Sequence, residues 1–566
     1  MTEHVFTKAL AAGARQVAIW SQLLDRINVF PVADGDTGRN LVISLAPLQQ
    51  QFKNTEELSR SLLVAARGNS GNISSRFLQE LVTAASFDEL PVAVQRGRDQ
   101  AYEAVRDPQP GTMLSLFDEL AELCAETLPQ PDRFWTSDAL STLEQAVAAT
   151  PLGLPVLGRA GVVDAGALGM YLFFDGFFSC LAGTDPVFSS ETAIFSDRLS
   201  IDAQFHPEAV SGYCIDAVLE SGADVEAALD PEADSAVVMR SGDYVKVHLH
   251  APDLLQARAA LSERGKIISW ADDDLAAQTT AFSRTGAEGM VHIMTDAAGS
   301  LTREDAAELG ITLLDSYINI ETASMPETCC EAEALYRAML QGQRCSTAQA
   351  SAEERCQRYR AALELHPYVL YLCVGSAYTG NFATATAWKR EHDPDNRFTI
   401  IDTGAASGRL AVAVHRAARK ARLEPAEVEA YVRESLDFCF EYIFADSLKY
   451  LAAGGRISKT GAFFGDMLKR KPVISPQPDG ARRVAMVRNR AEQMSFALDK
   501  LAEVFASDGR GIALLQYTDN RGFVEQAATA VRARFPWAEL LVRPLSLTTG
   551  VHTGPGTWAV AFAADE

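Results

Sequence analysis

The spacing of apolar residues changes once along this chain of 566 residues, and that change limits the folds available to it. Up to about residue 185, apolar residues recur at steps of three and four, which is the period of an amphipathic helix. The clearest stripe consists of Phe6, Leu10, Ala14, Val17, Trp20, Leu24 and Ile27. From Met290 onward, short apolar runs alternate with helical segments, a pattern typical of a mostly parallel sheet covered by helices. The chain is also too long for one core, so we predict a multidomain protein.

A small unit separates the two halves. Residues 186–205 and 278–289 have the composition of linkers. Between them, residues 236–250 predict two strands joined at Ser241-Gly242-Asp243. The predicted domains are all-α, small α+β and two-lobed α/β, and they span residues 1–190, 206–277 and 288–566.

Charge and composition exclude several classes of protein. A formal net charge of −23 lacks the basic footprint that a nucleic-acid-binding protein needs. Residues 1–4 show no basic segment before an apolar core, so we predict no signal peptide. The most apolar run, residues 166–180, is interrupted by Asp175 and is too short to span a bilayer. Nine scattered cysteines without disulfide spacing predict reduced thiols, and hence a cytoplasmic enzyme.

Two carboxylates, Asp34 and Asp36, stand one residue apart in the loop at residues 28–40. Hard divalent cations such as Mg²⁺ prefer oxygen ligands and commonly link a few carboxylates to substrate phosphates. Gly35 and Gly38 permit the tight turn that aims both carboxylates at one point. The alternative is an Asx-rich turn without a ligand, because Asp, Asn and Gly are ordinary turn residues.

Three Gly-rich segments follow this loop, and two of them open helix-like patterns. Free N–H groups at a helix N-terminus bind anions, although each segment alone is equally consistent with a helix cap. Together with the loop, they resemble the nucleotide-binding domain of the dihydroxyacetone-kinase family, most closely the kinase subunit of bacterial fatty acid kinases. The shared phrases are Asn-Val-Phe-Pro-Val-Ala-Asp-Gly-Asp-Thr-Gly at residues 28–38, Ala-Arg-Gly-Asn-Ser-Gly at 66–71 and Ala-Gly-Val-Val-Asp at 160–164.

This resemblance covers about the first third of the chain. It implies a closed barrel of helices that binds ATP and two Mg²⁺ at one end. The implied magnesium ligands are Asn28, Asp34 and Asp36, the two aspartates also being catalytic. The implied nucleotide contacts are Thr37, Asn40, Asn69, Ser70, Gly71, Thr112 and Asp164. Arg39 departs from the Thr that the family often has, and a cation there either supports or crowds the triphosphate.

The small middle unit carries a candidate zinc site. Side chains alternate along a strand, so His248 and His250 share a face, roughly 7 Å apart. Cys214 lies on an earlier predicted strand and offers a third ligand of a type that Zn²⁺ favours. Spacing alone favours two surface histidines instead. The same Tyr-Cys and Lys-Val-His-x-His pattern occurs in the middle domain of the fatty acid kinase subunit, and this resemblance implies zinc binding by the three residues.

Polar residues follow the predicted strands of the C-terminal half, where ligands of α/β sheets usually bind. Examples are Thr295-Asp296 and residues 375–381. Two further phrases are Leu-Ala-Ala-Gly-Gly-Arg-Ile-Ser at residues 451–458 and His-Thr-Gly-Pro-Gly at 552–556. With them, essentially all of the chain after Met290 resembles the DegV family of fatty-acid-binding proteins.

The second resemblance implies a fatty acid with its tail buried and its carboxylate at the mouth of a pocket. The implied substrate contacts are Thr295, Asp296, Thr347, Ser376, His552 and Thr553. His552 and Arg456 would be catalytic, as groups close to the carboxylate and the incoming phosphate. The loops have drifted, since Ala297 and Ala298 stand where hydroxyls are common, and this leaves the identity of the ligand open.

Taken together, the resemblances imply ATP-dependent phosphorylation of a fatty acid to an acyl phosphate, with kinase and lipid-binding partner in one chain. One alternative is a kinase for another small carboxylate or hydroxyl substrate. Another is a lipid carrier or sensor whose kinase half is vestigial. We expect no nucleic-acid partner, no transmembrane segment, transient membrane contact only for lipid loading, and a homo-oligomer.

Overall fold

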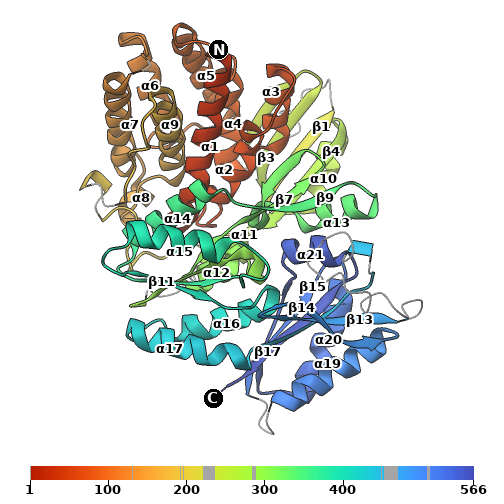
Figure 1. Ribbon diagram of the computed structural model, residues 1–566. Helices are drawn as coiled ribbons and strands as arrows, with labels where there is room; N and C mark the ends of the chain where they lie inside the picture. Colours follow the sequence, from red (N-terminus) through yellow and green to blue (C-terminus); the bar gives the residue numbers. More distant parts are fainter. Residues whose placement is uncertain are drawn as a thin grey trace. The chain divides into compact units, whose positions relative to one another are not determined.

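The computed structural model describes residues 2–130, 132–190, 193–195, 197–208, 210–220, 236–282, 289–447, 449–450, 470–505 and 510–565. The chain forms two compact units, Met1–Arg284 and Thr285–Glu566 (Figure 1). The multidomain prediction is confirmed, with a helical region first and an α/β region second. The predicted regions 1–190 and 206–277 both lie in the first unit, and the exact domain boundaries stay predictions.

Helices make up most of the first unit. They are α1 (Thr2–Arg26), α2 (Thr37–Leu45), α3 (Thr55–Ala65), α4 (Gly68–Leu81), α5 (Leu90–Ala104), α6 (Met113–Glu126), α7 (Arg133–Gly153), α8 (Pro155–Ala160) and α9 (Ala165–Ala182). The stripe predicted from Phe6 to Ile27 becomes the buried face of α1. The described part of the predicted linker also packs on this bundle, because Phe188 and Phe195 are buried against Tyr171.

Helix α9 is the core of the bundle. By length and composition it could span a membrane, so the prediction that this run is too short is wrong, but 83% of that window is buried inside the protein. Glycines let it pack closely on α1, since a Cβ at Gly176 would lie 2.7 Å from the Ala12 carbonyl oxygen. Asp175 is tolerated inside this helix because its carboxylate accepts the backbone N–H groups of Val187 and Phe188.

An antiparallel sheet completes the first unit. Its order is β2 (Val237–Ser241), β3 (Tyr244–Ala251), β1 (Tyr213–Glu220) and β4 (Lys266–Asp274), with helices α10 (Leu254–Ser262) and α11 (Leu275–Phe282) nearby in sequence. The predicted hairpin at Ser241-Gly242-Asp243 is confirmed. One face packs its own apolar core of Ile215, Ala217, Leu219, Val245, Val247 and Leu249. The other face meets the bundle, where Val218, Val237 and Met239 pack with Leu63 of α3 and Ala104 of α5.

The second unit contains the predicted parallel sheet. It has the order β11 (Phe398–Asp402), β10 (Val369–Cys373), β5 (His292–Asp296) and β6 (Thr312–Leu314), and every pairing is parallel. An antiparallel sheet follows, with the order β8 (Ala323–Pro326), β7 (Ser316–Ile320) and β9 (Cys345–Gln349). The surrounding helices are α12 (Arg303–Leu309), α13 (Ala332–Leu340), α14 (Ala352–Leu365), α15 (Asn381–His392), α16 (Ser407–Lys420) and α17 (Pro425–Ser435).

A six-stranded sheet departs from the expected parallel arrangement. Its order is β14 (Gly480–Val487), β13 (Lys471–Gln477), β12 (Phe440–Phe444), β17 (Trp558–Ala564), β15 (Gly511–Tyr517) and β16 (Ala538–Pro544), with α19 (Arg490–Val504), α20 (Arg521–Arg534) and α21 (Leu547–Thr553). Only β15 and β16 pair in parallel. Strands buried on both faces form apolar runs in either orientation, so the sequence pattern could not show this.

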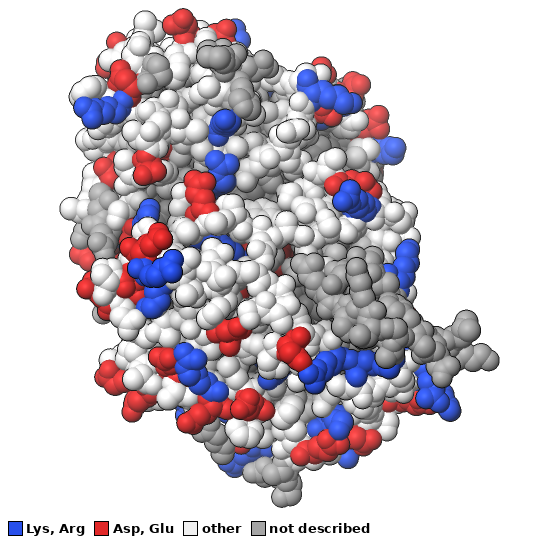
Figure 2. Space-filling view, in the orientation of Figure 1, with Lys and Arg blue, Asp and Glu red and all other residues white. Residues whose placement is uncertain are grey.

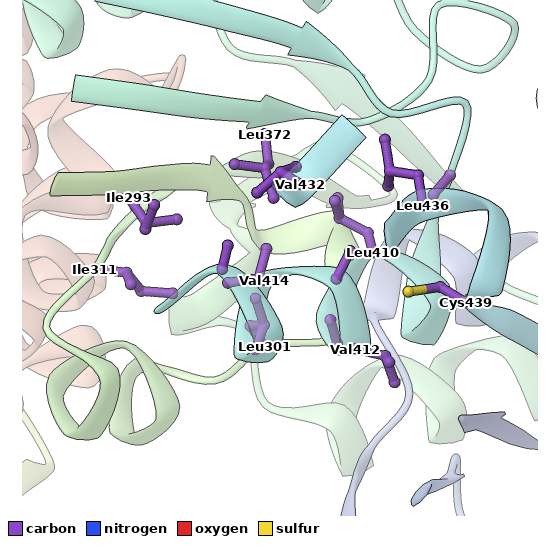
Figure 3. Packing of buried hydrophobic residues seen from close by; sticks show 14 of the residues in the cluster. Ile293, Leu301, Ile311, Leu372, Leu410, Val412, Val414, Val432, Leu436 and Cys439 are labelled. Atoms are coloured by element: carbon purple, nitrogen blue, oxygen red, sulfur yellow. The ribbon is translucent and has the colours of Figure 1, made fainter. Parts of the chain in front are cut away.

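Helix α16 joins the two larger sheets of this unit into one core (Figure 3). Residues 407–417 of the helix are all buried. Leu410 and Val414 pack in the cluster that holds Ile293 of β5 and Leu372 of β10. The same cluster includes Ile512 and Leu514 of β15, so one helix serves both sheets. Burial on every side explains why this helix is uniformly small and apolar at its centre.

Surface charge is mixed in sign. Figure 2 shows acidic and basic side chains interspersed on one face, and the described residues there form no extended basic patch.

Candidate functional site

The Asp-Gly-Asp loop connects α1 to α2 in the first unit, and Asp36 is the N-cap residue of α2. Gly35 has a positive φ of 69°, which only glycine adopts without strain. Asn28 ties the loop together, because its Nδ2 donates to the Val32 carbonyl and its Oδ1 accepts the Thr37 N–H. Since Asn28 Oδ1 already has this partner, the observed role of Asn28 is to shape the loop; metal ligation by it stays a prediction.

Negative charge gathers at this loop. Burial, and then the neighbouring Asp36, raises the pKa of Asp34 well above its ordinary value. Burial raises the pKa of Asp36 to about 6, and Asp25 and Asp273 add to the increase. Carboxylates that repel one another in this way gain stability from a bound cation. The group therefore has the charge and the donor atoms of a divalent metal site.

An anion site lies beside these carboxylates. Helix α4 begins at Gly68, whose φ is 59° and whose Cβ would lie 2.2 Å from Asn40 Nδ2, so glycine is required there. The first-turn N–H groups of Asn69 and Ser70 follow, and Ser70 Oγ lies 3.5 Å from Thr37 Oγ1. A Cβ at Gly166 would lie 3.3 Å from Ser70 Oγ and 2.7 Å from Met113 Cε, so the first turns of α4, α6 and α9 lie close together. Such N-termini are suited to phosphate.

Thr112 and Asp164 act as helix caps in the structure. Thr112 Oγ1 accepts the Leu114 N–H at the start of α6, and Asp164 Oδ1 accepts the Ala167 N–H at the start of α9. Burial raises the pKa of Asp164 to about 7. Neither residue lines the cavity beside Asp34, and a contact of either with nucleotide stays a prediction.

The three predicted zinc ligands come together on the sheet. Cys214, His248 and His250 offer ligand atoms that all lie within 4.8 Å of one another. Cross-strand pairing of Cys214 with His250 explains this, since partners across an antiparallel pair face the same side. Burial, and then His248, lowers the pKa of His250 to about 3, which keeps it in the neutral form that binds metals.

The structure brings the two predicted metal sites to one cavity within the first unit. Its lining comprises Asn28, Phe30, Pro31, Asp34, Asp36, Thr37, Asn40, Gly68, Asn69, Ser70, Cys214, His248 and His250. The sequence did not predict this proximity, because it depends on how the sheet packs against the bundle.

A second candidate site lies in the second unit. An apolar cavity of about 140 Å³ is bordered by β7 and β9 of the three-stranded sheet, by β12, β13 and β14 of the six-stranded sheet, and by helix α21. Among its lining residues are the predicted contacts Thr347, His552 and Thr553. Thr347 Oγ1 lies 3.3 Å from His552 Nε2, so two polar side chains meet at a cavity that apolar residues such as Ile443 also line. Apolar walls with a few convergent polar groups are typical of small-molecule sites.

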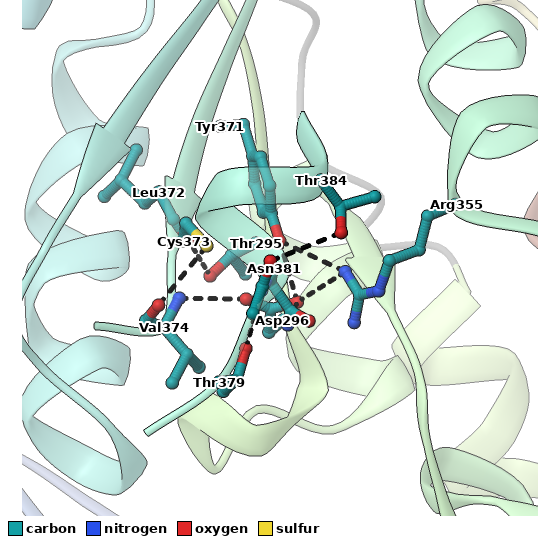
Figure 4. A network of polar contacts seen from close by, with 11 residues as sticks. Thr295, Asp296, Arg355, Tyr371, Leu372, Cys373, Val374, Thr379, Asn381 and Thr384 are labelled. Carbon is teal, nitrogen blue, oxygen red and sulfur yellow. Dashed lines mark hydrogen bonds and ion pairs between the residues drawn. The ribbon is translucent and has the colours of Figure 1, made fainter. Parts of the chain in front are cut away.

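Three other predicted substrate contacts do not line this cavity. Thr295 is fully buried, and its hydroxyl donates to the Leu372 carbonyl. Asp296 is the centre of a buried network, with Arg355, Tyr371, Asn381 and the Val374 N–H as its donors (Figure 4). Ser376 is exposed, and its N–H donates to Asp402. Arg456 lies outside the described residues.

Asp296 organises the sheet edge in the structure. Its carboxylate is 0% exposed and accepts from four groups of the protein, among them Arg355 of α14, far away in sequence. A contact of Asp296 with substrate stays a prediction.

Sequence reasoning also missed Asp216. It lies two residues after Cys214 on β1, and hence on the same face of the sheet. The strand period of two was the signal that could have found it.

Comparison with known proteins assigns a separate family to each of the two units of the chain. The DAK2 domain model matches residues 31–179. The DegV family model, described as a family of uncharacterised proteins, matches residues 290–565. Protein YloV of Bacillus subtilis is 30% identical over 285 residues, which is 44% of this chain and 51% of YloV. An uncharacterised protein of Staphylococcus haemolyticus is 28% identical over 282 residues, or 44% and 50% of the two chains. The chain thus spans about half the length of the curated relatives it matches.

Solved structures resemble part of the chain. A DegV family protein from Thermus thermophilus, described for its fatty acid binding, shares 25% identity and a TM-score of 0.45, covering 49% of this chain and 99% of that one. DegV of Bacillus subtilis, described as a fatty acid binding protein, shares 19% identity and a TM-score of 0.45 over the same fractions. On the evidence of the two family models, this chain is a fusion of a DAK2 domain with a DegV-family domain.

Proposed function

We propose that the protein is an ATP-dependent kinase that phosphorylates a fatty acid carboxylate to an acyl phosphate. The observation that carries the proposal is the cavity of the first unit, where Asp34 and Asp36 lie beside the first turn of α4. A cation site next to an anion site is the arrangement that a metal–nucleotide complex requires. The DAK2 domain, a kinase-type domain, matches the same residues.

In this proposal, different residues of the cavity have different roles in phosphoryl transfer. When bound, Mg²⁺ would neutralise charge on the phosphates, held by Asp34 and Asp36. The N–H groups of Asn69 and Ser70 would orient the γ-phosphate. The substrate carboxylate is ionised at pH 7 and needs no general base. Its oxygen forms a bond to the γ-phosphorus as the bond from that phosphorus to the bridging oxygen of ADP breaks, so ADP leaves with the electron pair.

Zinc is the metal that best suits Cys214, His248 and His250. Thiolate and imidazole favour Zn²⁺, and the residues fit it, because His248 Nε2 is buried without a hydrogen-bond partner in the described part of the chain. The three residues would hold the ion with one further ligand. Its contribution in this proposal is to fix the sheet beside the nucleotide cavity.

The DegV-family domain would supply the acyl substrate. Thr347 and His552, which lie together in the lining of its cavity, would meet the carboxylate, and apolar lining residues such as Ile443 and Ile474 would contact the tail. Fusion would keep donor and acceptor domains at an effective concentration of about 1 mM, as for short linkers. A cytoplasmic location and a homo-oligomeric state belong to the same proposal.

Two measurements on one preparation test the proposal. Mass spectrometry would identify the lipid carried by the purified protein, and hydroxylamine would trap acyl phosphate formed with ATP and palmitate. We expect a bound fatty acid and ATP-dependent hydroxamate. If no lipid is carried or can be loaded, the fatty acid assignment is wrong.

One observation favours a second candidate, a kinase for a smaller carboxylate. The cavity of about 140 Å³ is below the roughly 300–1,000 Å³ of typical small-molecule sites. In addition, Thr295, Asp296 and Ser376 do not line it. Replacing palmitate by short-chain acids in the hydroxamate assay separates the two candidates, because only the second predicts faster turnover with the shorter acids.

A further inference from the structure

One carboxylate contacts both helix α4, which begins at the candidate anion site, and a ligand of the candidate metal centre in the first unit. Asp216 is 6% exposed, and its Oδ2 accepts the Gly68 N–H at 2.9 Å, at the first residue of α4. Its Oδ1 accepts Asn72 Nδ2 at 2.9 Å, one turn further along the same helix. The same Oδ1 lies 3.4 Å from His248 Nδ1. Asp216 therefore bridges the helix of the anion site and a ligand of the candidate metal centre.

A buried cation lies against this carboxylate. Lys246 is 2% exposed, and its Nζ lies 3.2 Å from Asp216 Oδ1. Asp216 and Lys246 neutralise each other, so the pair adds no net charge beneath the first turn of α4.

The two contacts depend on each other through geometry. A carboxylate that holds one imidazole nitrogen fixes the ring of a metal-ligating histidine, and removing such a partner typically costs 10–100-fold in metal affinity. The same carboxylate holds the Gly68 N–H, and so fixes the direction of the next N–H groups, those of Asn69 and Ser70. A shift of the Asp216 carboxylate toward His248 would therefore also move the Gly68 N–H, and a shift toward Gly68 would move the His248 ring.

We propose that Asp216 is a positioning residue that couples occupancy of the Cys214–His248–His250 metal centre to nucleotide binding at the first turn of α4. This inference rests on the proposed function, which supplies the metal and the nucleotide. Coupling between sites is reciprocal, so zinc should strengthen nucleotide binding by the same factor by which nucleotide strengthens zinc binding. The factor should be on the order of 10, within the range typical of linked sites.

The test uses the full chain and two binding measurements. Affinity for a non-hydrolysable ATP analogue with Mg²⁺ is measured by calorimetry on zinc-loaded and zinc-stripped protein. Zinc affinity is measured by chelator competition with and without the analogue. The parental protein should give the same factor, about 10, in both directions. Asp216→Asn should lower that factor to about 1 and weaken zinc binding roughly 10–100-fold.

Two further variants separate coupling from a structural role. Asn72→Ala removes one contact between Asp216 and α4 and leaves Asp216 and every metal ligand in place, so it should reduce the factor while zinc still binds. If Asp216→Asn does not fold, the coupling factor of Asn72→Ala tests the proposal in its place. Asp243→Asn, an exposed residue of the β2–β3 turn, is the matched control and should keep the parental factor.

The outcomes are distinct. A factor near 1 in the parental protein, with both ligands bound, overturns the coupling and leaves the proposed function intact. An unchanged factor in Asp216→Asn, or in Asn72→Ala when the first variant is unfolded, also overturns it. Failure of the parental protein to bind the analogue refutes the proposed function, and failure to bind zinc removes the candidate metal centre; either result also refutes this inference.

Discussion

Replacement of Asp296 by alanine tests whether this residue organises the second unit or binds a ligand. Its carboxylate is 0% exposed and accepts from Arg355 Nη1 at 3.1 Å, Tyr371 Oη at 2.9 Å, the Val374 N–H at 2.8 Å and Asn381 Nδ2 at 2.9 Å. The Arg355 side chain is 3% exposed, so it cannot turn to water when its partner is removed. Asp296→Ala would therefore leave a buried guanidinium uncompensated.

The expected loss follows from that uncompensated charge. Breaking a buried ion pair by removing one partner costs about 3–5 kcal/mol. Domains are typically stable by about 5–15 kcal/mol, so this variant should lose a large part of the free energy of unfolding of its domain. Asp296→Ala combined with Arg355→Met removes both charges, and should recover more than half of the loss because no unpaired charge remains.

Urea unfolding followed by tryptophan fluorescence measures these changes. Trp388 packs in the cluster that contains Tyr371, so it reports on this part of the molecule. Asp395→Ala, at an exposed position of the same domain, is the control and should change stability by less than about 0.5 kcal/mol. The reasoning is refuted if Asp296→Ala loses less than about 1 kcal/mol, a typical surface-scale effect, while ligand binding is abolished.

Three further predictions concern other sites. Asp36→Asn should keep the fold but abolish ATP turnover, measured as ADP release, whereas the exposed control Asp107→Asn should retain it; parental turnover in Asp36→Asn would remove the metal assignment. Metal analysis of dialysed protein should find about one zinc per chain, lost in His248→Ala and kept in the exposed control His206→Ala; a value near zero that added zinc does not raise would contradict the site. Burial raises the pKa of Glu441 from 4.5 to about 7, so the folded state holds more protons than the unfolded state and stability falls as pH rises through this window. Glu441→Gln should remove roughly 3 kcal/mol of that fall in urea titrations at pH 4.5 and 7.5, and an unchanged slope would show that Glu441 is not responsible.

The fold could be predicted well where a local pattern determines it. The stripe from Phe6 to Ile27 became α1, and the hairpin at Ser241-Gly242-Asp243 formed as expected, because helix and strand periods are properties of short segments. The face shared by His248 and His250 followed from the same rule.

Features that depend on distant segments could not be predicted. The cavity shared by Asp34 and Cys214 requires the sheet to pack on the bundle, through contacts such as Leu63 with Val218. The structural role of Asp296 requires Arg355, which lies 59 residues later. No pattern in the sequence around Asp296 reports that partner, so its structural role could not be predicted from its place at the end of a strand.

The position of β17 has a consequence for how the second unit is made. Residues 558–564 form an interior strand of the six-stranded sheet, between β12 and β15, although they are the last strand in sequence. During synthesis, β12 and β15 therefore have no shared neighbour until this segment has left the ribosome. The hydrogen-bonding edges of both strands stay open for that time, and open edges invite pairing with other chains. The six-stranded sheet can therefore close only once β17 has been made, and the interval before β17 pairs is the one in which chaperones matter most.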